Sequence, residues 1–200
     1  MGERARPQTR RPPSQLRYAG LAAVVVLWVS VATAMYRAGL GFLGDRPISY
    51  LGTDPRSALV FRGGLIVAAG LMAGFSWYAF QRFSAPRSFL AASLIGLVGQ
   101  VVAAVVLLSG PGSSHAVHTA GGLVLGASLP ILMWRFAAAS ALGQRRRIAG
   151  CALFLLELVA CAAGVALSIS GRAPIAEIVP AFAFHLWVAV VTFWATSPAP

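Results

Sequence analysis

The sequence predicts an all-α membrane protein built as a bundle of six transmembrane helices, and three observations support this. First, 58% of the 200 residues are hydrophobic and only 10% are charged, against about 25% charged residues in a typical soluble domain. Second, six long stretches are each able to cross a hydrocarbon core of about 30 Å as a helix. Third, membrane-spanning strands are about half that length and alternate in polarity. The same composition excludes a soluble domain, a disordered chain and a scaffold held by disulfides.

The six predicted spans contain few polar residues. They cover residues 18–36, 58–80, 88–110, 116–134, 148–170 and 175–195. The first span carries no charge, and the others carry Arg62, Gln100, His118, Glu157, and the pair Glu177 and His185, in that order. The first span is longer than the 7 to 15 apolar residues of a cleaved signal peptide, so we expect it to be retained. Residues 1–17, rich in arginine and proline, form a flexible cytoplasmic tail in this prediction, and 196–200 a short one.

The arginines predict the orientation of the bundle. All 16 basic residues are arginine. Eleven of them fall in the N-terminal tail and in the second and fourth connections, and four fall in the first and fifth connections. The positive-inside rule then predicts that both termini lie in the cytoplasm. We expect a multi-pass protein of the plasma membrane, and the chain's richness in arginine, alanine, glycine and proline favours a bacterial inner membrane.

The net charge of +11 also bears on partners. The arginines are divided among positions next to the spans and form no basic stripe on a soluble domain, so nucleic acid is not the expected partner. The expected partners are anionic lipid head groups. Glycines four residues apart, Gly70 with Gly74 and Gly122 with Gly126, predict helix faces that pack closely and that could join copies of the chain in a homo-oligomer.

Three polar residues are predicted to lie near the middle of the membrane. Glu157 and His185 are each about ten residues inside their spans, and Gln100 is about twelve residues inside its own. A charged group at such depth costs roughly 2.5 to 3.5 kcal/mol by insertion scales. We therefore expect a Glu157 to His185 hydrogen bond with Gln100 nearby. This polar pair could simply join helices, or it could handle protons or bind a ligand.

A second polar group is predicted near the outer surface. Arg62 is one turn into its span, Glu177 is near the outer end of the last span, and His118 follows His115 at the start of the fourth. An Arg62 to Glu177 ion pair would neutralise two costly charges. With Ser49 of the first connection, these side chains could form a polar pocket for a lipid head group.

Two further interpretations concern residues at the same end of the bundle. Asp54, followed by Pro55, is expected to cap the helix that begins there. His115 and His118 could share a metal ion, but His185 would lie about 10 Å deeper. We therefore expect neither a metal nor a cofactor.

The first connection carries a recognisable pattern. Pro47-Ile48-Ser49-Tyr50-Leu51-Gly52-Thr53-Asp54-Pro55, followed by Phe61, resembles the Pro-(x)-Ile-Ser-Asp-x-Gly...Pro...Phe signature of the DRAM/FRAG/SFK family of six-helix membrane proteins. His118-Thr119-Ala120-Gly121-Gly122 and Glu177 continue the likeness. Tyr50 and Thr119 depart from it, since acidic residues often occupy those positions. A related bacterial family of unknown function shares the same six-helix pattern.

The resemblance implies a protein that does not transport and that is tied to membrane-lipid organisation. Its eukaryotic relatives are linked to autophagy, lipid asymmetry, phosphoinositide signalling or remodelling of lipid-anchored proteins. The expected function is non-enzymatic binding or organisation of lipids through the pocket of Arg62, His118, Glu177 and Ser49. Two alternatives remain open. One is an intramembrane lipid-modifying enzyme with a histidine base and either Ser49 or a bound water as nucleophile, and the other is a small proton-linked transporter that uses Glu157 and His185.

Overall fold

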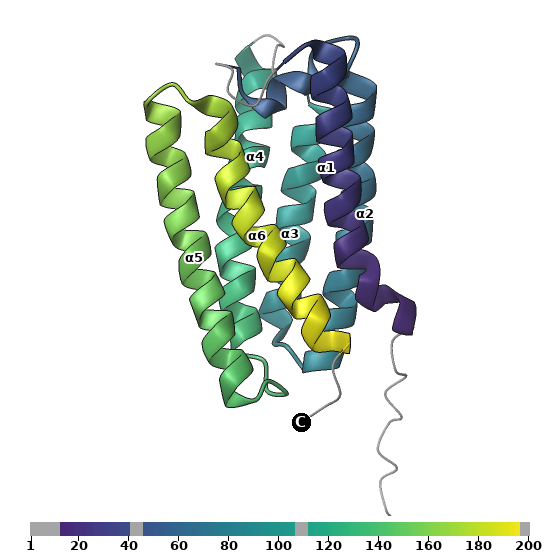
Figure 1. Ribbon diagram of the computed structural model, residues 1–200, viewed down its shortest axis with the longest axis vertical. Coiled ribbons are helices and arrows are strands. Elements are labelled where there is room, and N and C mark those ends of the chain that lie inside the picture. Colours follow the sequence, from purple (N-terminus) through teal and green to yellow (C-terminus); the bar gives the residue numbers. More distant parts are fainter. Residues whose placement is uncertain (1–12, 41–45, 107–111, 197–200) are drawn as a thin grey trace, which may run out of the picture.

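The computed structural model is a bundle of six long helices (Figure 1), and it describes residues 13–40, 46–106 and 112–196. The helices are α1 (Ala19–Ala38), α2 (Ala58–Phe83), α3 (Arg87–Val105), α4 (Gly112–Ala137), α5 (Gln144–Ile169) and α6 (Ala173–Thr196). Two short 3₁₀ helices are η1 (Ser14–Tyr18) and η2 (Ile48–Gly52). The described residues contain no strand. The predicted all-α six-helix fold is thus confirmed.

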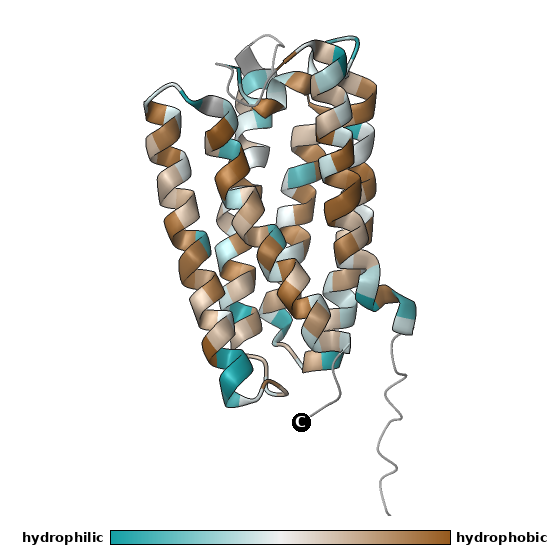
Figure 2. Ribbon diagram, in the orientation of Figure 1, coloured by the Kyte–Doolittle hydropathy of each residue, from teal (hydrophilic) through white to brown (hydrophobic). Residues whose placement is uncertain are grey.

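Each of the six helices is long and apolar enough to cross a membrane. Figure 2 shows hydrophobic residues along most of each helix, with hydrophilic ones gathered toward the helix ends. A membrane core supplies no hydrogen-bond partners, so a chain of this composition satisfies its backbone groups within helices. The chain is therefore an integral, multi-pass membrane protein.

The helix boundaries differ from the prediction at several places. η1 occupies the last part of the predicted flexible tail and leads directly into α1. α4 and α5 begin before the predicted starts, so that Arg145, Arg146 and Arg147 belong to α5. Charge marks where the apolar run ends, but a helix continues until a residue such as Gly39, in the left-handed conformation at the end of α1, stops it. Residues 1–12, 107–110 and 197–200 of the predicted tails and third span lie outside the described residues.

Neighbouring helices in the sequence pack side by side, and α6 closes the bundle by crossing α1, α2 and α4 as well as packing along α5. In the described parts of the chain, α5 packs mainly on α4 and α6, at the edge of the bundle (Figure 1). α1 begins and α6 ends at the same end of the bundle (Figure 1). We call the opposite end, where η2 lies, the η2 end.

A close helix contact joins α3 to α4 through glycines. A Cβ atom added at Gly99 would lie 2.7 Å from the carbonyl oxygen of Gly121, and one added at Gly121 would lie 2.9 Å from that of Gly99. By contrast, a Cβ atom at Gly70, Gly122 or Gly126 would meet nothing within 4 Å. The predicted Gly122 and Gly126 pair was therefore wrong as a packing contact within the chain, whereas a Cβ atom at Gly74 would lie 3.3 Å from the Leu16 side chain. Four-residue spacing shows that two glycines share a face but not which face.

Aromatic side chains fill the bundle interior nearer the end where the chain terminates. The Phe136 ring of α4 is fully buried and lies 5.2 Å from the Phe83 ring, 5.7 Å from the Phe89 ring and 5.3 Å from the Trp187 ring, centroid to centroid. These partners come from α2, α3 and α6. The cluster therefore joins four helices.

Candidate functional site

The η2 end contains most of the residues that the sequence singled out. Glu177 of α6 accepts hydrogen bonds from the Ser49 backbone N–H at 3.1 Å and from the Ser49 hydroxyl at 3.2 Å. His118 lies close enough to interact electrostatically with the same carboxylate. The Glu177 carboxylate thus tethers η2 to the start of α6 and brings three of the predicted pocket residues into one neighbourhood.

Arg62, the fourth predicted residue, also contacts η2. Its Nε donates to the Gly52 carbonyl oxygen at 2.9 Å, and its Nη2 donates to the same oxygen. The predicted Arg62 to Glu177 ion pair is not formed, because each side chain instead binds the backbone of η2 within its reach. Both contacts hold η2 across the end of the bundle, Arg62 from α2 and Glu177 from α6.

His118 is buried and its Nδ1 lies 3.0 Å from the Val106 carbonyl oxygen, just after the end of α3. The histidine therefore joins α4 to the end of α3. The Ser49 hydroxyl donates to Glu177, and no hydrogen bond joins it to His118 among the described residues. His115 is exposed, one turn earlier on α4. No three His, Cys, Asp or Glu side chains in the described parts of the chain group as metal ligands would.

Asp54 stabilises the turn that precedes α2. Its carboxylate accepts the Arg56 N–H at 2.8 Å and forms an ion pair with the Arg56 guanidinium at 3.1 Å. The prediction that Asp54 caps the second long helix was wrong, because that helix, α2, begins only at Ala58. The side-chain and backbone hydrogen bonds from Arg56 lower the pKa of Asp54. These hydrogen bonds therefore stabilise the fold at pH values above the ordinary pKa of aspartate, and the stabilisation is lost as pH falls through the lowered pKa of Asp54.

The three residues predicted at mid-membrane are separated. His185 accepts a hydrogen bond at its Nδ1 from the Trp28 indole N–H at 3.0 Å, and Gln100 donates to the Leu65 carbonyl oxygen at 2.8 Å. The predicted Glu157 to His185 hydrogen bond is not formed. Trp28, in the uncharged first span, was missed, although a buried indole N–H needs an acceptor and its depth in α1 matches that of His185 in α6.

Glu157 of α5 is fully buried. One carboxyl oxygen lies 3.5 Å from the Cys161 sulfur, one turn further along the helix. The other oxygen has no hydrogen-bond partner in the structure. A buried polar atom without a hydrogen-bond partner costs roughly 1 to 3 kcal/mol. The Glu157 carboxyl therefore needs a physical explanation.

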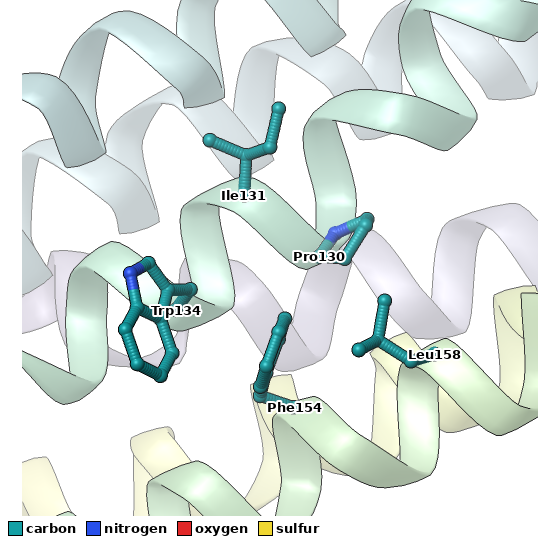
Figure 3. A pocket seen from close by; sticks show the side chains of 5 residues that line it. All are labelled: Pro130, Ile131, Trp134, Phe154 and Leu158. Atoms are coloured by element: carbon teal, nitrogen blue, oxygen red, sulfur yellow. The ribbon is translucent and has the colours of Figure 1, made fainter.

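An apolar groove of about 400 Å³ lies between α4 and α5 (Figure 3). Pro130, Ile131 and Trp134 of α4 line it, together with Phe154 and Leu158 of α5. The rings of Trp134 and Phe154 are 5.3 Å apart. Its wall has no polar surface, which suits contact with hydrocarbon chains.

Comparisons with known proteins give no match to a family model, to a curated protein or to a solved structure.

Proposed function

We propose that this integral membrane protein binds and organises anionic lipids without catalysing a reaction, and that Arg62 at the η2 end is the main contact for the lipid phosphate. This function accords with the DRAM/FRAG/SFK resemblance, which implies a role in membrane-lipid organisation. The observation that carries it is the uncompensated charge of Arg62, which contacts a carbonyl oxygen and forms no ion pair with a described carboxylate.

The position of Arg62 suits a phosphate ligand. It lies one turn inside α2, about 6 Å from the helix start, which corresponds to the level where hydrocarbon meets head groups. A guanidinium has five N–H donors, and the contact with Gly52 leaves several of them available to phosphate oxygens. Charge-assisted hydrogen bonds of this kind are about twice as strong as neutral ones.

The rest of the site supports the same ligand. Ser49 and Glu177 fix η2 beside Arg62, and the Arg46 guanidinium stacks on the Tyr50 ring of η2, 4.6 Å from its centroid. Arg46 adds a second positive charge at this end. His118 supports the neighbouring helix ends. Glu177 would then orient η2 and shape the pocket, while Arg62 supplies the attraction.

We expect Arg62→Ala to weaken phosphatidylglycerol binding by about tenfold, as the loss of one charged hydrogen bond of about 1.5 kcal/mol predicts. Native mass spectrometry of the full chain, titrated with phosphatidylglycerol or phosphatidylcholine, measures the effect. Arg37→Ala is the matched control, because Arg37 is exposed at the same end of the bundle. Wild-type binding by a folded Arg62→Ala protein would contradict the proposed site.

We also propose that both termini are cytoplasmic and that the η2 end is external, in the inner membrane of a bacterium. The end at which α1 begins and α6 ends carries seven of the described arginines, which supports this orientation. They are Arg17, Arg82, Arg87, Arg135, Arg145, Arg146 and Arg147. A green fluorescent protein fused after Pro200 should fluoresce, and alkaline phosphatase fused there should be inactive. An active phosphatase fusion with a dark fluorescent one would reverse the orientation and place the Arg62 site in the inner leaflet.

A further inference from the structure

Glu157 lies in the interior of the bundle, and no described side chain forms an ion pair with it. Among the described residues, α5 packs mainly on α4 and α6. Residues 126–134 of α4 contain no titratable side chain, and residues 180–190 of α6 contain only His185, which is bound by Trp28 of α1. Cys161 is the only titratable side chain that the structure shows in contact with Glu157.

The cost of burying a charge determines the form of this carboxyl. A carboxylate removed from water without a counter-charge costs several kcal/mol. No described side chain offers that counter-charge, so the neutral acid is the stable form in this environment. The neutral acid has one O–H donor, and the oxygen without a partner is the place for that proton.

We propose that Glu157 is a proton-binding site inside the membrane, occupied at neutral pH, and that the groove between α4 and α5 gives apolar molecules access to it. Phe154 precedes Glu157 by one turn and Leu158 follows it directly, and both line the groove. α5 also has the most lipid-accessible face of the six helices. This site is independent of the lipid-phosphate site at Arg62.

Dicyclohexylcarbodiimide, an apolar reagent, tests the proposal directly. A protonated carboxyl adds across one C=N bond of the reagent to form an O-acylisourea, which rearranges to an N-acylurea with no atom lost. An ionised carboxylate does not react in this way. The full chain in phosphatidylglycerol vesicles is treated at pH 8, and the labelled peptides are identified by mass spectrometry.

We expect label at Glu157 at least about ten times that at Asp54, which is ionised in its pair with Arg56. In the Glu157→Gln variant the α5 peptide should carry no label. A water-soluble carbodiimide, used in place of the apolar reagent, should leave Glu157 of the wild type unlabelled. Label at Glu157 no greater than at Asp54 would overturn the proposal.

A second test compares the melting temperatures of the wild type and Glu157→Gln at different pH values. Glutamine has the shape of the neutral acid and cannot ionise, so Glu157→Gln should melt at the wild-type temperature at pH 6. Between pH 7 and pH 10 the wild type should lose several degrees more than the variant, because only its carboxyl is forced to ionise. Equal losses in the two proteins, or a variant already destabilised at pH 6, would overturn the proposal.

Discussion

Gly121→Ala is expected to destabilise the protein strongly, whereas Gly122→Ala, one residue further along α4, should be neutral or slightly stabilising. At Gly121 the new methyl group would lie 2.9 Å from the Gly99 carbonyl oxygen and 3.1 Å from the Ala103 nitrogen. These are backbone atoms, so α3 and α4 would have to separate. At Gly122 the methyl group would meet nothing within 4 Å.

The two substitutions therefore differ only in where the methyl group points. Overpacking a tight contact costs typically 1 to 3 kcal/mol, and the loss of close backbone approach weakens the whole α3/α4 contact. In an open helix position, alanine gains roughly 0.5 to 1 kcal/mol over glycine. We expect a fall in melting temperature of about 5 °C or more for Gly121→Ala and no fall for Gly122→Ala.

Thermal unfolding of both purified variants, followed by intrinsic tryptophan fluorescence, measures this difference. Gly99→Ala serves as a second test of the same contact, since its methyl group would lie 2.7 Å from the Gly121 carbonyl oxygen. If Gly121→Ala and Gly122→Ala melt together, α3 and α4 do not pack through these glycines.

The sequence was sufficient to predict the number of spans and the residues that mark each, because hydrophobicity and length determine which segments enter a membrane. It was not sufficient to predict how each helix is rotated. The glycine contacts show this, since Gly121 is buried and Gly122 faces outward. The hydrophobic period that orients a helix in a soluble protein is weak here, because lipid and protein interior are both apolar.

The polar contacts were predictable in depth but not in partner. Ser49, Glu177 and His118 meet at one end, as their positions in the chain predicted. Arg62 reached a carbonyl of η2 instead of Glu177, and His185 paired with Trp28 instead of Glu157. Residues at the same depth can lie on opposite sides of a bundle. A backbone carbonyl and an indole N–H are uncharged, so a prediction that pairs charged residues does not include them as partners.

Phe136→Ala is expected to have the other large effect. The Phe136 ring is completely buried and contacts aromatic rings from α2, α3 and α6, so its removal leaves a cavity where four helices meet. In water-soluble proteins Phe→Ala costs about 3 to 5 kcal/mol, part of it for the lost transfer out of water. Helices separated in a membrane keep their side chains in lipid, so that part is absent here.

The remaining cost is the lost contact between packed atoms, for which each aromatic pair adds about 0.5 to 1.5 kcal/mol. We expect Phe136→Ala to lose about 2 to 4 kcal/mol and Phe182→Ala to lose almost nothing, because the Phe182 ring on α6 is 64% exposed. Reversible unfolding in lipid bicelles measures both. Similar losses for the two variants would mean that the ring's contact with lipid is worth as much as the buried cluster, and that the aromatic core does not hold the four helices together.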